Sequence, residues 1–125
     1  MQYRLKVEIE YLICLGNEKT IKDLPAFPKD EQTRLRKIYE NFNTAAAKKV
    51  KDIESATNHD VKAIEYYIQS KVKKSLHPWI HFALTSEDIN NLSYSLMWQN
   101  GVKKVYLPAL QSMNRELKKL ARKYK

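Results

Sequence analysis

Apolar residues near the start of the chain fit two different periods. From Leu5 to Tyr11 every second residue is apolar and those between are charged, which is the pattern of a half-buried strand. Leu5, Ile9 and Leu12, however, are spaced by four and three residues and would share one face of a helix. Periodicity therefore leaves strand and helix open for this segment.

The middle of the chain has helical spacing throughout. After a stop at Gly16-Asn17 and a proline-containing loop, Asp30 is placed to cap a helix over residues 31–42. An alanine-rich stretch over residues 45–53 predicts the next helix. Two apolar stripes follow, the first at Val61, Ile64, Ile68 and Val72 and the second at Ile89, Leu92 and Leu96. Each stripe predicts a further helix.

The last segment carries the most regular stripe. Its apolar residues step by four, three, four, three and four positions, at Tyr106, Leu110, Met113, Leu117, Leu120 and Tyr124. Such a seam requires facing helices. Pro108 lacks an amide N–H, so we expect a kink or a late helix start there rather than a straight helix from Val102. With only two glycines and no internal repeat, the residues predict an all-α chain.

The same pattern excludes several classes of protein. No run of 18 apolar residues is present, so we expect no membrane span and no membrane partner. The first residues, MQYRLKVEIEYL, alternate charged and apolar positions and lack the features of a secretory signal, so we expect a cytoplasmic protein. Cys14, flanked by Ile13 and Leu15, is expected to be buried, and a single cysteine excludes an intramolecular disulfide.

A net charge of +9 suggests a nucleic-acid partner, because clustered lysines and arginines bind phosphate backbones. The charge is concentrated at one end: residues 101–125 hold eight basic residues and one acid, a net charge of +7. This distribution is typical of one face of a helix that belongs to a larger bundle. A small basic helical module that binds nucleic acid or a protein through residues 101–125 remains the alternative function.

Two short sequences of the same form precede apolar stripes. Thr57-x-x-Asp60 and Thr85-x-x-Asp88 each place a hydroxyl residue three positions before an acid, as capping boxes do at the start of a helix. In such a box the hydroxyl accepts from a backbone N–H, and the acid complements the positive end of the helix dipole. Capping alone would account for all four residues.

The polar neighbours of these helix starts allow a second interpretation. Asn58, His59 and Ser86 add donors and acceptors beside N–H groups that have no partner in the helix. Two such starts that converge would bind a small polyanion. His77 and His81 are four residues apart and would share a helix face, but no third ligand stands nearby, so we expect packing rather than metal binding.

Residues 57–66, TNHDVKAIEY, and residues 81–93, HFALTSEDINNLS, resemble bacterial members of the adenylosuccinate lyase family, within the aspartase/fumarase superfamily. The second sequence is the more specific, because shorter forms of Thr-Ser-x-Asp run through the whole superfamily. The resemblance extends over almost the whole chain. It implies that the ambiguous first segment is helical.

The family resemblance also implies a reaction. Enzymes of this family cleave adenylosuccinate to AMP and fumarate, and succinyl-aminoimidazole-carboxamide ribotide to its carboxamide and fumarate, by β-elimination and without a cofactor. Asn58, His59 and Asp60 match the first substrate-binding stretch of the family. Thr85 and Ser86 match the second, which contacts the succinyl end. The implied partners are these small molecules and not nucleic acid.

The resemblance further implies that the site is incomplete in this chain. The family's general acid histidine and its base, a serine on a mobile loop, are expected beyond Lys125. Residues 1–100 would form the N-terminal helical domain without its extreme N-terminus, and residues 101–125 the first part of the central bundle. Each site of the family's homotetramer draws on three subunits. We therefore expect the chain alone to be inactive.

Overall fold

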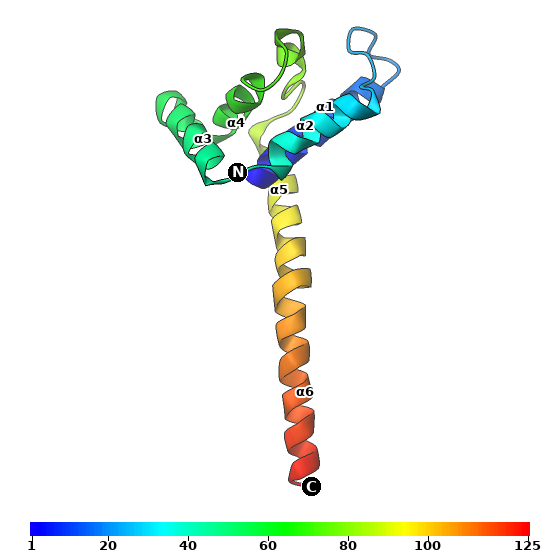
Figure 1. Cartoon of the computed structure of the whole chain (residues 1–125), viewed down its shortest axis with the longest axis vertical. Coiled ribbons are helices and arrows are strands. Elements are labelled where there is room, and N and C mark those ends of the chain that lie inside the picture. The colour runs from blue at the N-terminus through cyan, green and yellow to red at the C-terminus, as the bar shows by residue number, and fades with distance from the viewer. The chain divides into compact units, whose positions relative to one another are not determined.

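The structure, a computed structural model, describes residues 1–125, and its regular elements are all helical (Figure 1). In chain order they are α1 (Gln2–Asn17), α2 (Lys29–Glu40), α3 (Thr44–Thr57), α4 (Asp60–Gln69), the 3₁₀ helix η1 (Lys74–Trp79), α5 (Ser86–Gly101), the π-helical turn η2 (Val102–Tyr106) and α6 (Leu107–Lys123). The all-α prediction is confirmed. None of these helices combines the length and the apolar character needed to cross a membrane.

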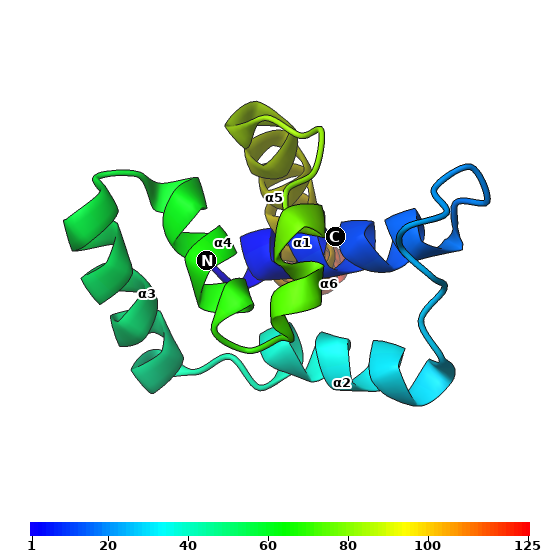
Figure 2. The same cartoon turned by 90° about the horizontal axis from the view of Figure 1, so that it is seen from above.

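Contacts divide the chain into two compact units, Met1–Ser93 and Tyr94–Lys125. In the first unit α4 packs against both α3 and α1, and α2 packs along α1 (Figure 2). The second unit is a single helical path that contains the end of α5, η2 and α6. Both polar sequences singled out above lie in the first unit.

The ambiguous first segment is the helix α1, so the strand alternative is wrong. Val7 and Ile9 lie about 200° apart around a helix and cannot share one narrow face. Both are nevertheless buried, Ile9 within the core cluster shared with α2 and α4, and Val7 outside that cluster. A helix with two packed sides carries apolar residues at nearly every second position, which imitates the alternation of a strand.

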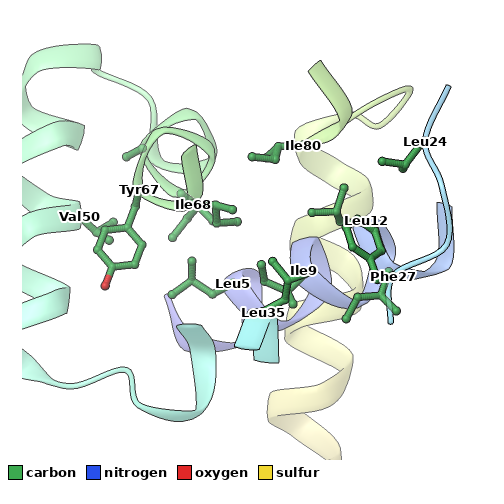
Figure 3. Close-up of a cluster of buried hydrophobic side chains, with 13 residues drawn as sticks. Leu5, Ile9, Leu12, Leu24, Phe27, Leu35, Val50, Tyr67, Ile68 and Ile80 are labelled. Carbon is green, nitrogen blue, oxygen red and sulfur yellow. The ribbon is translucent and has the colours of Figure 1, made fainter. Parts of the chain in front are cut away.

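One hydrophobic core joins the helices of the first unit (Figure 3). The following core residues are at most 2% exposed: Leu5, Ile9, Leu12, Leu24, Leu35, Val50, Ala63, Ile64 and Ile68. Fully burying a leucine or isoleucine side chain contributes roughly 1.5–3 kcal/mol. The core therefore fixes α1 and α4 relative to each other, and with α4 the candidate residues at its start.

Two helix starts differ in detail from the sequence predictions. α2 begins at Lys29 directly after Pro28, so Asp30 lies in its first turn and is not the cap. The carboxylate of Asp30 still complements the positive end of the helix. α3 is capped by Asn43, whose side-chain oxygen accepts the Ala46 N–H at 3.0 Å. A short polar side chain thus caps α3, whereas α2 starts without a side-chain cap.

Cys14 is exposed, so the prediction that it is buried is wrong. Its apolar neighbours in sequence, Leu12 and Ile13, are buried. In a helix, successive residues point about 100° apart, and a residue does not inherit the environment of its neighbours. The prediction depended on sequence adjacency, which has no such meaning within α1.

The helical path of the second unit is interrupted where Pro108 predicts an irregularity. η2 is a wide turn in which the Leu107 N–H bonds to the Val102 carbonyl, five residues back, and α6 starts at Leu107. Pro108 has no N–H to offer to the preceding turn, and a π-helical turn is one arrangement that accommodates this loss. The apolar residues Met113, Leu117, Leu120 and Tyr124 of α6 are all exposed.

An ion pair with two hydrogen bonds joins α1 to α2. Arg36 donates from Nε to Glu10 Oε1 at 2.8 Å and from Nη2 to Glu10 Oε2 at 2.9 Å. The Tyr39 hydroxyl donates to Glu10 Oε1 at 2.7 Å. Chiefly through the hydrogen bond from Arg36, these contacts lower the pKa of Glu10. Burial and the hydrogen bond to Glu10 raise the pKa of Tyr39 to about 12.

Replacing Glu10 with Gln should reduce the free energy of unfolding at pH 7 by about 1 kcal/mol or less, because the pair is partly exposed. The folded-state pKa of Glu10 lies below its usual 4.5, so the stabilisation is present above that pH and is lost as pH falls through the folded-state pKa. Urea denaturation at a series of pH values measures the difference between the two proteins. A difference that stays constant into acid would contradict this assignment.

Candidate functional site

The first candidate stretch forms the corner between α3 and α4. Asn58 closes α3 in the left-handed region, with φ 51°, and its N–H bonds to the Glu54 carbonyl at 2.8 Å. His59 is extended and is the N-cap of α4, and Asp60 begins the helix. Asparagine tolerates the left-handed region better than most residues, which explains its place at this tight corner.

The cap of α4 is not the residue that the capping-box pattern indicates. Thr57 ends α3, and its hydroxyl donates to the Ile53 carbonyl at 3.1 Å. The acceptor at the head of α4 is His59 Nδ1, which lies 3.1 Å from the Lys62 amide nitrogen. Because Nδ1 accepts this N–H, a neutral His59 ring carries its proton on Nε2. About half of the side chain is exposed, so it can present an N–H donor to a ligand.

A depression of about 580 Å³ lies over this corner, with Lys51, Glu54, Ser55, Asn58, His59 and Asp60 around it. Its size falls in the range of small-molecule sites. Lys51 pairs with Glu54 across its wall at 2.8 Å. The structure therefore gathers Asn58, His59 and Asp60 around one hollow that is lined by polar and charged side chains.

The second candidate stretch starts α5 as a capping box. Thr85 donates to Asp88 Oδ2 from its backbone N–H at 2.7 Å and from its hydroxyl at 2.9 Å. These two hydrogen bonds, the backbone one first, lower the pKa of Asp88. α5 then begins at the half-buried Ser86. The capping interpretation holds for Asp88, which accepts the Thr85 N–H, but not for the Thr85 hydroxyl, which donates to Asp88 rather than accepting a backbone N–H. Ser86 remains for a ligand.

Arg4 of α1 joins the two stretches. Its Nη2 lies 2.7 Å from Asp60 Oδ2, and its Nε donates to Asn90 Oδ1 at 2.9 Å. Asp60 begins α4, and Asn90 lies about one turn after Ser86 on α5. One guanidinium group thus contacts the opening turns of both helices. Charge and fork geometry make arginine suited to two such contacts at once.

His81 has a different role from the packing predicted for it. His81 lies beyond η1 with φ 61°, so it shares no helix face with His77, whose Nε2 is 3.0 Å from the Gln69 carbonyl oxygen. His81 Nδ1 is 2.6 Å from Glu8 Oε1, and its Nε2 is 4.0 Å from Glu65 Oε1. The spacing of residues along the sequence could not predict the contact between His81 and Glu8, because the two residues are 73 positions apart.

The carboxyl group of Glu8 is completely buried, and its Oε2 has no hydrogen-bond partner. Burial raises the pKa of Glu8, and the hydrogen bond to His81 opposes that shift. Glu65 lies beside it with only 7% of its side chain exposed and pairs with Lys62 at 2.7 Å. His81 therefore holds together two carboxyl groups that would otherwise repel each other in the core of the first unit.

Comparison with known proteins shows the family. A sequence profile described as lyase matches residues 1–125. The chain belongs to this lyase family. Among curated relatives, the adenylosuccinate lyase of Haemophilus influenzae is 41% identical over 130 residues, covering all of this chain and 28% of the relative. That of Dictyostelium discoideum is 42% identical over 133 residues, with the same coverage.

The adenylosuccinate lyase of Legionella pneumophila (strain Philadelphia 1) is 44% identical over 113 residues, covering 86% of this chain and 25% of the relative. The chain thus spans about a quarter of the length of these lyases. The resemblance read from residues 57–66 and 81–93 is confirmed. It also agrees with an all-helical structure in which both motifs start helices.

Proposed function

We propose that this chain contributes to the substrate site of an adenylosuccinate lyase, which cleaves adenylosuccinate to AMP and fumarate and succinyl-aminoimidazole-carboxamide ribotide to its carboxamide and fumarate. One observation carries the proposal: the two stretches that match the lyase motifs begin α4 and α5, and Arg4 contacts both helices. Both substrates carry a phosphate and two succinyl carboxylates, and helix starts favour such anions.

Asn58, His59 and Asp60 are proposed to bind one part of the substrate, in the hollow at the corner of α3 and α4. The Nε2–H of the half-exposed His59 side chain and the Asn58 amide are suited to phosphate or carboxylate oxygens. Asp60 can only accept hydrogen bonds when ionised, so a hydroxyl or amino group of the nucleotide is its natural partner. Thr85 and Ser86 are proposed to bind the succinyl carboxylates.

The chemistry explains why donors are needed at the succinyl end. In the elimination a base removes a proton from the carbon next to a carboxylate, and negative charge spreads onto that carboxylate. The carbon–nitrogen bond then breaks, and an acid protonates the departing nitrogen. Hydrogen-bond donors fixed near the carboxylate stabilise this charge more than they stabilise the substrate. We assign the Ser86 hydroxyl to this stabilisation, and the Thr85 hydroxyl as well when its hydrogen turns from Asp88 to the substrate carboxylate. Neither the acid nor the base is assigned to this chain.

Assembly into a homotetramer in the cytoplasm is part of the same proposal. The second unit supports it with large apolar side chains that are exposed on its single helical path, among them Tyr94, Met97, Trp98 and Tyr106. Together with the exposed stripe of α6, these side chains form an apolar surface of the kind that marks protein–protein contacts. Residues 1–100 and 101–125 are proposed to serve as the N-terminal domain and the first part of the central bundle.

A chimera tests the function. This chain replaces the matching 130 residues of the Escherichia coli adenylosuccinate lyase, with which it is 41% identical. We expect the chimera to release fumarate from adenylosuccinate and the 125-residue chain alone to release none. A folded tetrameric chimera without activity would refute the proposal, as would steep, salt-dependent binding of the chain to duplex DNA together with an inactive chimera.

A further inference from the structure

We propose that Arg4 is a positioning residue, which sets the spacing between the two substrate-binding stretches without contacting substrate itself. The inference deepens the proposed function and rests on it. It assigns a role to a residue of α1 that belongs to neither motif. Its basis is one side chain with two partners on two different helices.

The geometry of Arg4 distinguishes it from an ordinary surface ion pair. Only 17% of the Arg4 side chain is exposed, whereas the Asp60 side chain is 45% exposed. Nη2 is 2.7 Å from the Asp60 carboxylate, and Nε is 2.9 Å from the Asn90 amide oxygen. Movement of α4 away from α5 would break one of these contacts. The planar fork of arginine therefore fixes a distance as well as a charge.

A second link lies one turn further along α1. Glu8 is four residues after Arg4 and on the same side of the helix. It contacts His81, which precedes Thr85 by four residues, and His81 approaches Glu65 of α4. One side of α1 thus contacts α4, α5 and the segment that leads into α5. The link through Arg4 is the one that contacts a proposed binding residue, Asp60, directly.

Lysine at position 4 separates charge from geometry. Its single ammonium group can still pair with Asp60, but it cannot donate to Asp60 and Asn90 in the directions that the fork uses. Arg36 supplies a matched control, because it also gives two hydrogen bonds that tie α1 to a neighbouring helix, here through Glu10. Neither Glu10 nor Arg36 belongs to the candidate site.

The first measurement uses the 125-residue chain itself. Amide chemical shifts from heteronuclear NMR should change at both 58–61 and 85–90 in Arg4→Lys, although the two segments are distant in sequence. Arg36→Lys should leave both segments unchanged and alter residues of α2. If Arg4→Lys changes only one of the two segments, or neither, Arg4 does not couple them and the inference is wrong.

The second measurement uses the chimera, whose fumarate release without further change tests the proposed function separately. Errors of about 1 Å in substrate position can lower rates by up to a hundredfold, so we expect Arg4→Lys to lower kcat/KM roughly tenfold, mostly through kcat. Arg36→Lys should stay within about twofold of the unmodified chimera. An active chimera in which Arg4→Lys also stays within twofold, or in which both variants lose activity equally, would overturn the role of Arg4 alone.

Discussion

His59→Asn should lower the kcat/KM of the active chimera by about ten- to a hundredfold while leaving its stability nearly unchanged. In the structure His59 can have two separate functions, because Nδ1 caps α4 through the Lys62 N–H, whereas Nε2 is not used in that contact and about half of the side chain is exposed. Asparagine is among the best N-cap residues, so it keeps the first function and removes the second. Hydrogen bonds to charged groups contribute about 1.5–3 kcal/mol, which corresponds to the expected loss in kcat/KM.

Asn43→Ala is the control for this experiment. Asn43 caps α3 by the same kind of contact, with its side chain accepting the Ala46 N–H, but it belongs to neither candidate stretch. Its replacement should lower the free energy of unfolding by about 1 kcal/mol and leave kcat/KM unchanged. Steady-state kinetics and urea denaturation measure the two quantities. Full activity in a folded His59→Asn variant would remove His59 from the site.

His81→Asn should destabilise the 125-residue chain by about 3–5 kcal/mol at pH 7, because it leaves the buried Glu8 carboxylate without a counterpart beside Glu65. Asparagine is chosen because His81 has φ 61° and asparagine also tolerates that region, so backbone strain contributes little. Adding Glu8→Gln to His81→Asn removes the unpaired charge and should restore most of the lost stability.

The effect of His81→Asn should depend on pH with a definite sign. Burial raises the pKa of Glu8 above its usual 4.5, and without His81 the opposing hydrogen bond is gone. A carboxyl group with a raised folded-state pKa folds more readily when protonated, so the destabilisation should grow as pH rises above 4.5 and fade below it. Equal stability of His81→Asn and the parent at pH 7 would show that the Glu8 contact contributes nothing.

The sequence predicts helices well where apolar residues keep helical spacing and poorly where they alternate with charged residues. The stripe at Val61, Ile64 and Ile68 leads directly to α4, although α3 and α1 both pack against that helix. α1 carries apolar residues at alternating positions because α2 and α4 both cover it, and only family resemblance identifies it as a helix. The prediction that Cys14 is buried is wrong for a related reason, because residues that are neighbours in sequence point in different directions around a helix.

The sequence predicts those parts of the candidate site whose residues lie close together along the chain. Thr85 and Asp88 form a local box whose spacing alone is sufficient to recognise it. At the other helix start, the spacing from Thr57 to Asp60 imitates a box although Thr57 closes the preceding helix, because two helices meet there within two residues. The spacing of apolar residues within one helix does not show where the preceding helix ends.

The contacts that hold the site together could not be predicted from spacing. Arg4 and Asn90 are 86 positions apart, and Glu8 and His81 are 73 apart. Each pair exists because the core places α1 between helices that come much later in the chain. A charged residue on the apolar side of a predicted helix, as Glu8 is, is the one local sign that such a partner is required.

The wide turn η2 has a consequence for the direction in which the second unit presents its apolar side chains. Tyr94, Trp98, Val102, Tyr106 and Leu110 succeed one another by four positions each. In an uninterrupted α-helix these four steps would rotate the row by about 160°, so that its two ends would face nearly opposite ways. Because a π-helical turn holds one residue more, it takes back about 100° of that rotation. The π-helical turn thus keeps the aromatic residues at the start of the row and Leu110 at its end on nearly the same side of the helix. One facing helix could then contact both ends of the row.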